Sequence, residues 1–228
     1  MRTIPISVAI ACLGLLLVPH VLSAQGENRE GDQRFVIAAN TGVEADSLEI
    51  IEKAEKLFRK KDYDGVITIL AGPAYADPSR YDVNLLLARA QVEKCAELKR
   101  KGDPSYKTLV YRPYETAQRL HKVRTHQELY YITAKSLLIN NRPARAVKTI
   151  KKALRLLPDT PHYLLVLGDA YYEQAVFAKK VDRDAYIIKR LFAKARAAYE
   201  EIMSLEHADA ETKALTSAIL NELSEQTK

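Results

Sequence analysis

The chain has 228 residues, a formal net charge of +6, two cysteines and eight glycines. Two cysteines exclude a scaffold held by several disulfides. The longest apolar run, Val8 to Val18, is well short of the ~20 residues that a membrane-spanning helix needs, so we expect a protein that does not span a membrane.

Residues 1–24 have the features of a secretory signal peptide. Arg2 supplies a positive n-region, the uncharged run follows it, and a small residue suited to cleavage stands at Ala24. An uncleaved anchor is the alternative interpretation. We expect cleavage after Ala24 and a periplasmic or secreted protein, in which Cys95 remains as a buried, unreactive thiol.

The rest of the chain is predicted to be nearly all helix. Residues 25–45 are polar and are interpreted as a mobile leader, and Asp46 or Ser47 is expected to cap the first helix. Pro113 should start or kink the second half of the fourth helix. Helical patterns cover residues 47–60, 63–71, 81–101, 105–123, 127–140, 143–156, 161–181, 184–205 and 209–224.

Two consecutive frames of 34 residues, starting at Gln127 and Pro161, repeat one set of packing positions. This spacing resembles that of the tetratricopeptide repeat (TPR), a hairpin of two helices, and together with the signal peptide it resembles an exported bacterial TPR protein. We expect Gly168 to lie where the first helix touches the second helix of its own hairpin. The positions are held by Ala134, Leu137, Ala146, Ile150, Ala153 and Pro158 in the first frame and by Leu164, Leu167, Gly168 and Tyr171 in the second.

The same positions recur 80 residues earlier in the chain. Ala54, Leu57, Val66, Leu70 and Pro78 precede Ala134, Leu137, Ala146, Ile150 and Pro158 by that offset. We interpret this as a duplicated module, 47–126 and 127–206, each with one ordinary hairpin and one longer hairpin. The resemblance implies an all-α, right-handed helical solenoid of about four hairpins over 46–206, closed by a capping helix within 207–228.

The long hairpins are predicted to project beyond their neighbours. Between Tyr171 and Ala195 the apolar stripe continues past the usual turn and returns, so the added residues should be helical and should carry the turn roughly 10 Å further out. Basic residues and tyrosines surround both turns, which either bind anionic ligands with apolar faces or are ordinary solvated turns. They are Lys99, Arg100, Lys101, Tyr106, Lys107, Tyr111, Arg112 and Tyr114 in the first turn and Lys179, Lys180, Arg183, Tyr186, Lys189 and Arg190 in the second.

The resemblance also implies a concave groove lined by the first helix of each hairpin. Several of the apolar residues in it are equally well explained by packing between repeats. The implied groove residues are Leu48, Ile51, Glu55, Phe58 and Arg59; Asp82, Leu85, Arg89, Val92 and Glu93; Glu128, Tyr131, Lys135, Leu138 and Ile139; and His162, Leu165, Asp169, Tyr172 and Glu173.

A second candidate surface is the helix predicted over 143–156. Arg145, Lys148, Lys152 and Arg155 recur at helical spacing on one of its faces. The predicted export makes nucleic acid an unexpected partner, and acidic proteins, anionic lipid or cell-wall polymer fit that compartment better. An ordinary solvated helix face is the alternative interpretation.

The sequence carries no pattern of catalytic, cofactor or metal-binding residues. His121 and His126 lack ligand neighbours at metal-binding spacing, and the scarce glycines form no phosphate loop. We therefore expect no enzyme, no cofactor and no metal site. Three functions remain open: a cell-envelope scaffold whose groove binds a protein or peptide, a binder of anionic cell-wall polymer or lipid, and a ligand-delivery partner of a transporter.

Overall fold

A computed structural model describes residues 48–226 of the chain. The predicted signal peptide, the leader and the cap at Asp46 or Ser47 lie outside the described residues. The described part is helical without a β-strand, which confirms the all-α prediction. Helical residues 48–59 are followed by α2 (Tyr63–Ala76), α3 (Tyr81–Arg100), α4 (Tyr106–Leu109), α5 (Tyr111–His121), α6 (Gln127–Ile139), α7 (Pro143–Leu156), α8 (Pro161–Lys180), α9 (Ala185–Ser204) and α10 (Ala210–Gln226).

Local sequence explains where several helices begin. The side chain of Asp62 accepts a hydrogen bond from the backbone N–H of Gly65 and caps α2, and Asp184 caps α9 in the same way through Tyr186. Helices α7 and α8 begin with proline, whose fixed φ and missing N–H suit the first helical turn. The prediction for 105–123 is refined, because α4 ends at Leu109 and α5 begins two residues before Pro113.

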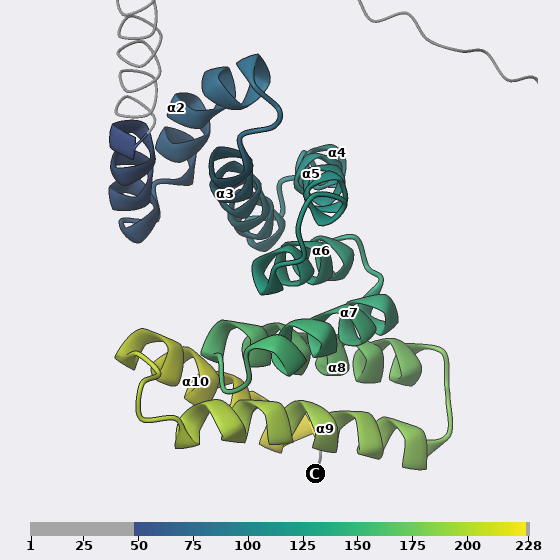
Figure 1. Ribbon diagram of the computed structural model, residues 1–228. Coiled ribbons are helices and arrows are strands. Elements are labelled where there is room, and N and C mark those ends of the chain that lie inside the picture. The colour runs from purple at the N-terminus through teal and green to yellow at the C-terminus, as the bar shows by residue number, and fades with distance from the viewer. Residues whose placement is uncertain (1–47, 227–228) are drawn as a thin grey trace, which may run out of the picture. The chain divides into compact units, whose positions relative to one another are not determined.

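Each helix packs on the next one along the chain, and α6 also packs on both α3 and α8 (Figure 1). The buried side chains form three clusters, each shared by successive helices. The α10 helix covers the last of these clusters with Leu223, which is fully buried. Among the described residues, none of the helices is both long enough and apolar enough to cross a lipid bilayer.

The 80-residue offset found in the sequence recurs in the bounds of the helices. The bounds of α7 and α8 are those of α2 and α3 moved by 80 positions. Residues with positive φ follow the same offset, since Lys61 and Asn141 have φ of 60° and 55°, and Gly102 and Asp182 have φ of 74° and 52°. The corresponding turns therefore share their backbone conformation as well as their place in the chain.

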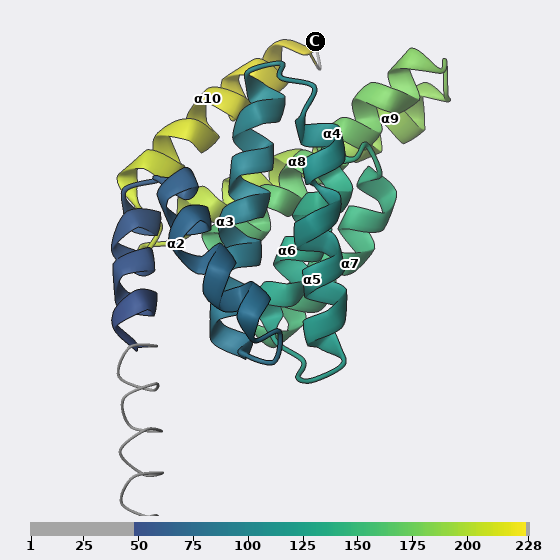
Figure 2. The same cartoon turned by 90° about the horizontal axis from the view of Figure 1, so that it is seen from above.

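The hairpin of α8 and α9 is longer than the others, as the continued apolar stripe predicts. Both helices have 20 residues, whereas α6 and α7 have 13 and 14. Figure 2 shows the joined ends of α8 and α9 extending beyond α7 and α5. In the first module the returning helix is divided into α4 and α5, so the two long hairpins differ in their second half.

Candidate functional site

The helices α3, α6 and α8 form a continuous wall, and most of the polar residues predicted for the groove meet on it. The centre of the wall is Glu93 of α3, whose carboxylate accepts two hydrogen bonds from Lys135 Nζ of α6, at 2.7 and 2.6 Å. Tyr131 donates its hydroxyl proton to the same carboxylate. Burial raises the pKa of Glu93, but Lys135 and Tyr131 outweigh burial and lower it overall. The wall is therefore held together by a compact, charge-assisted network.

A second carboxylate, Glu128, joins all three helices. It accepts a hydrogen bond of 2.6 Å from the hydroxyl of Tyr163 and lies 3.3 Å from His162 Nε2 and 3.5 Å from Arg89 Nε. Burial acts to raise the pKa of Glu128, but His162, Arg89 and Tyr163 more than compensate and lower it to about 2. Glu128 is thus ionised in the folded protein over the whole neutral range.

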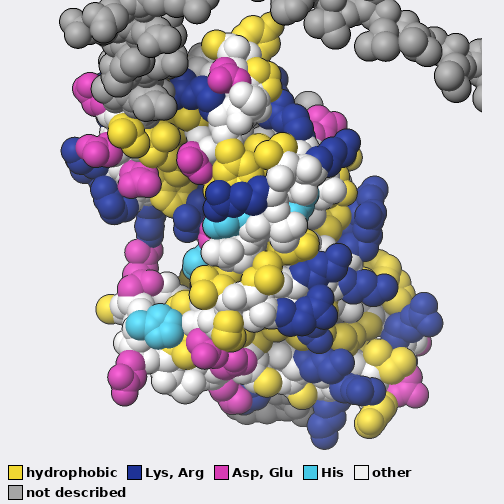
Figure 3. Space-filling model, viewed as in Figure 1, with side chains coloured by type: hydrophobic (Ala, Val, Ile, Leu, Met, Phe, Trp, Pro, Cys, Tyr) yellow, Lys and Arg dark blue, Asp and Glu magenta, His cyan; other side chains and the backbone are white. Residues whose placement is uncertain are grey.

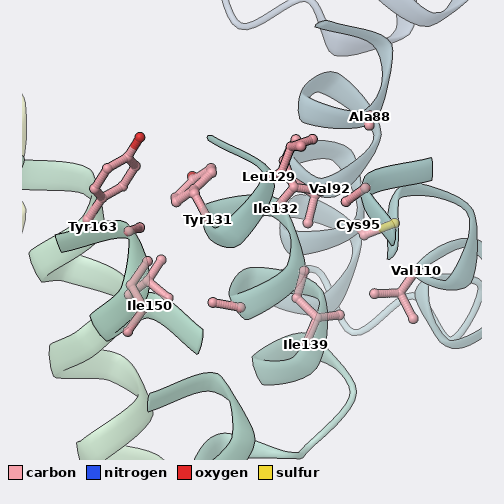
Figure 4. Packing of buried hydrophobic residues seen from close by; sticks show 14 of the residues in the cluster. Ala88, Val92, Cys95, Val110, Leu129, Tyr131, Ile132, Ile139, Ile150 and Tyr163 are labelled. Carbon is pink, nitrogen blue, oxygen red and sulfur yellow. The ribbon is translucent and has the colours of Figure 1, made fainter. Parts of the chain in front are cut away.

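Two tyrosines of this network, Tyr131 and Tyr163, also belong to the hydrophobic core (Figure 4). Tyr131 is 3% exposed and its ring lies 5.6 Å from that of Tyr163 on α8. In Figure 4 Tyr131 stands between Tyr163 on one side and Ile132 and Val92 on the other. Tyr131 was predicted as a groove residue, but its side chain lies inside the protein and stabilises the wall instead of offering a surface.

The third polar contact of the wall lies within the long hairpin. Tyr199 of α9 donates a hydrogen bond of 2.7 Å to Asp169 of α8. Burial raises the pKa of Asp169 to about 6, although Tyr199, Lys135 and Lys99 act to lower it. The Tyr199 ring also fills the space above Gly168, where an added Cβ would lie 2.4 Å from a ring carbon. The predicted contact of Gly168 with the second helix of its hairpin is confirmed.

The part of the wall that remains accessible is mixed, with exposed charged residues beside half-buried apolar ones. The Arg89 guanidinium lies 4.9 Å from the centre of the Phe58 ring and so links the helix at 48–59 to α3. Tyr172 is tied to α10 through Glu222, at 3.1 Å. Of the remaining predicted groove residues, Leu48, Glu55, Arg59 and Glu173 are exposed, and Ile51, Leu85, Leu138 and Leu165 are half-buried.

The predicted basic residues on α7 form one exposed face. Arg145, Lys148, Lys152 and Arg155 are all exposed. Figure 3 shows Lys and Arg side chains gathered over α7 and over the joined ends of α8 and α9. The ring of Tyr171 connects the two regions, because Lys151 Nζ of α7 and Lys194 Nζ of α9 lie 5.6 and 5.4 Å from its centre.

The two basic turns predicted for the long hairpins have different surroundings. In the first, Lys99 donates to Asn141 Oδ1 at 3.2 Å and to the Leu138 carbonyl at 3.4 Å, so this turn packs on the loop between α6 and α7. Lys101 pairs with Glu97, while Arg100 and Arg112 are exposed. In the second turn every residue from Lys179 to Ile187 is exposed.

The remaining candidate residues have structural environments. Cys95 is 2% exposed, which confirms the prediction of a buried thiol, and burial raises the pKa of this thiol to about 11, which disfavours the reactive thiolate. The His121 ring lies against the Tyr130 ring, with ring centres 4.5 Å apart and planes tilted by 49°, and His126 caps α6 by accepting a hydrogen bond from the Glu128 N–H.

Sequence reasoning missed Tyr163 and Tyr199. Both are aromatic residues at core positions of their helices, and nothing in the sequence says that their hydroxyls reach carboxylates on another helix. No protein-family model matches the chain, and no curated protein matches it either.

Proposed function

We propose that this protein is a TPR-like helical solenoid that works as a non-catalytic scaffold in the cell envelope. In this proposal the wall of α3, α6 and α8 binds a segment of a partner protein. The observation that carries the proposal is that the groove residues inferred from the resemblance meet on these three helices through Glu93, Lys135 and Glu128. The offset of 80 residues in the helix bounds supports the repeat interpretation.

Burial separates the residues that hold the wall together from the residues that a partner could contact. Glu93, Tyr131 and Lys135 satisfy one another and fix the spacing of α3 and α6. A partner would therefore meet the half-buried apolar residues, such as Leu85 and Leu165, together with Arg89, which lies one helical turn after Leu85 on α3. A rigid wall of this kind costs little ordering entropy on binding, which favours affinity for an extended or helical segment.

Site-specific photo-crosslinking tests this proposal. A photoreactive amino acid at Leu85 or at Leu165 should crosslink one and the same partner protein in cells of the source organism. The control positions are Leu156 and Leu157 at the end of α7, which are 54% and 45% exposed and lie off the wall. Equal crosslinking from the control positions, or none from the wall, would contradict the proposal.

A further inference from the structure

The strongest unassigned surface is the turn between α8 and α9, here called the α8–α9 tip and defined as residues 176–190. Five of its large apolar side chains are exposed, whereas Ala178 is buried and Ile188 packs against the core. The exposed fractions are 63% for Phe177, 71% for Tyr186, 47% for Ile187, 44% for Val181 and 38% for Val176. Isolated exposed apolar residues are ordinary, but a cluster at one projecting end indicates an interaction site.

The corresponding turn of the first module is anchored to a neighbouring loop at its base, which distinguishes it from the tip. There Lys99, Asn140 and Asn141 bring the turn between α3 and α4 against the loop between α6 and α7. Lys99 bonds to Asn141, and the Asn140 amide lies 3.4 Å from the Tyr111 hydroxyl. Lys179, which stands 80 positions after Lys99, is exposed. The first turn is thus anchored at Lys99, although its residues 100–105 are exposed, whereas Lys179 of the tip is exposed and makes no such contact among the described residues.

The charge of the tip is strongly one-sided. It holds five basic residues and two acidic ones, and Asp184 is already used to cap α9. The basic residues are Lys179, Lys180, Arg183, Lys189 and Arg190. Tyr186, Arg190 and Lys194 follow at intervals of four along α9, so the positive charge continues along one helix face towards Lys151 of α7 (Figure 3).

We propose that the α8–α9 tip binds the surface of an anionic lipid bilayer, with Phe177, Tyr186 and Ile187 entering the interface. Lysine and arginine attract anionic headgroups, and aromatic and aliphatic side chains placed among them gain from burial at the boundary with the acyl chains. An anionic polymer would use the charges but has no apolar phase to receive the aliphatic side chains. A projecting convex end also suits a planar surface better than a concave site on a protein (Figure 2).

The chain contains no tryptophan, so a single introduced tryptophan reports on the tip without background. In the variant Phe177→Trp, vesicles with about a third phosphatidylglycerol should shift the emission to the blue, and brominated lipid should quench it. Tyr75→Trp is the matched control, because Tyr75 is 90% exposed on α2. An unchanged spectrum of Phe177→Trp at saturating vesicle concentration would overturn the proposal.

Co-sedimentation separates the contributions of charge and burial. We expect binding to phosphatidylglycerol vesicles, much weaker binding to pure phosphatidylcholine, and a loss in high salt. Lys179→Glu/Lys180→Glu should lower the vesicle partition coefficient by about tenfold or more, and Phe177→Ser/Tyr186→Ser should lower it several-fold. The controls are Lys53→Glu/Lys56→Glu, which reverse exposed charges on the helix at 48–59, and Tyr75→Ser/Val123→Ser, which remove exposed apolar groups elsewhere.

Two outcomes would overturn the lipid proposal. One is binding to heparin or polyglutamate that equals binding to vesicles while Phe177→Ser/Tyr186→Ser has no effect on either, which indicates a site for polyanions. The other is that the protein does not bind vesicles, while substitutions at the tip abolish the crosslinks from Leu85 and Leu165 to the partner protein. That result places the tip in a protein interface. Melting curves of each variant show whether it folds, and the positions substituted at the tip and in its controls are all exposed.

Discussion

At the scale of single residues, Gly168 marks the closest approach of two helices. An added Cβ would lie 2.4, 2.7 and 2.8 Å from three carbons of the Tyr199 ring, and Tyr199 is 1% exposed and fixed by its bond to Asp169. We expect Gly168→Ala to destabilise the protein by about 1–3 kcal/mol, because the clash outweighs the gain in helix propensity.

The matched control for this substitution is Gly72→Ala in α2, where an added Cβ meets nothing within 4 Å. This change should stabilise the protein by up to about 1 kcal/mol, since alanine favours helix. Urea unfolding of both variants, followed by circular dichroism, measures the difference. Similar effects of the two substitutions would show that Tyr199 does not press against α8.

The buried carboxyl group of Asp169 should make the unfolding free energy depend on pH. Because burial raises its pKa to about 6 in the folded protein, the folded state binds a proton more readily than the unfolded chain. The stability from this group is fully present below about pH 4 and is lost as the pH rises through about 6. The loss should be on the order of 1–3 kcal/mol.

Asp169→Asn keeps an acceptor for the Tyr199 hydroxyl but cannot ionise, so this part of the pH dependence should disappear. Unfolding free energies measured between pH 4 and pH 8 check the prediction. Asp182→Asn is the control, because Asp182 is exposed in the turn and asparagine tolerates its positive φ. A wild-type slope that persists in Asp169→Asn would assign the titration to another group.

At the scale of the helices, Glu128 is the residue that ties α3, α6 and α8 together. Its pKa is lowered to about 2 in the folded protein. The stability that it contributes is therefore present above the unfolded value near 4.5 and is lost as the pH falls towards about 2. Between pH 5 and pH 2 the wild type should lose on the order of 2–3 kcal/mol more than Glu128→Gln does.

Acid titrations of the unfolding free energy test this expectation, with Glu52→Gln as the control because Glu52 is exposed on the helix at 48–59. Glu128→Gln should also be less stable than the wild type at pH 7, since Arg89 and His162 lose their negative partner. If Glu128→Gln and Glu52→Gln lose the same unfolding free energy between pH 5 and pH 2, ionisation of Glu128 does not contribute to holding the three helices together.

The helices themselves were largely predictable, and their lateral contacts were not. Pro143 and Pro161 mark the starts of α7 and α8 in the sequence, and the apolar stripe gives the length of α8. The prediction for α2 ended at 71, but the helix runs to Ala76 and includes Pro73. Gly72 and Pro73 signalled a stop locally, and the burial of Ala74 against the following helix overrides that signal.

The roles of the residues in the candidate site were also not predictable from the sequence. The wall positions followed from the resemblance, but their roles depend on which side chains face each other across helices. Tyr131 and Asp169 occupy positions where the resemblance predicts a ligand contact, yet both bond to residues of neighbouring helices. Helical spacing places a residue on a face and does not state the distance to the next helix.

At the scale of the whole described unit, an ion pair joins residues far apart in the chain. Lys61, in the turn before α2, pairs with Glu211 in the first turn of α10. We expect a short bismaleimide to crosslink the double variant Lys61→Cys/Glu211→Cys. The control is Lys61→Cys/Glu225→Cys, because 14 residues of helix place position 225 about 21 Å from position 211.

Mass spectrometry after brief reaction gives the readout in a Cys12→Ser background, and Cys95 does not react because its thiol is buried. The Glu211 pair should react at least about tenfold faster than the Glu225 pair. Equal rates, or no crosslink in either variant, would mean that α10 does not approach the turn at Lys61.

The ion pair between Lys61 and Glu211 reports on the packing of all the helices that lie between them in the chain. Closing a loop of 150 residues costs about 2 kcal/mol more entropy than closing one of 10 residues, whereas an exposed ion pair contributes about 0.2–1 kcal/mol. The pair therefore cannot draw the two ends together, and the packing of the helices between them must do so. Small rotations at each helix interface add up along the chain. The distance between Lys61 and Glu211 should therefore change more than the distance between neighbouring helices when α3, α6 or α8 rotates.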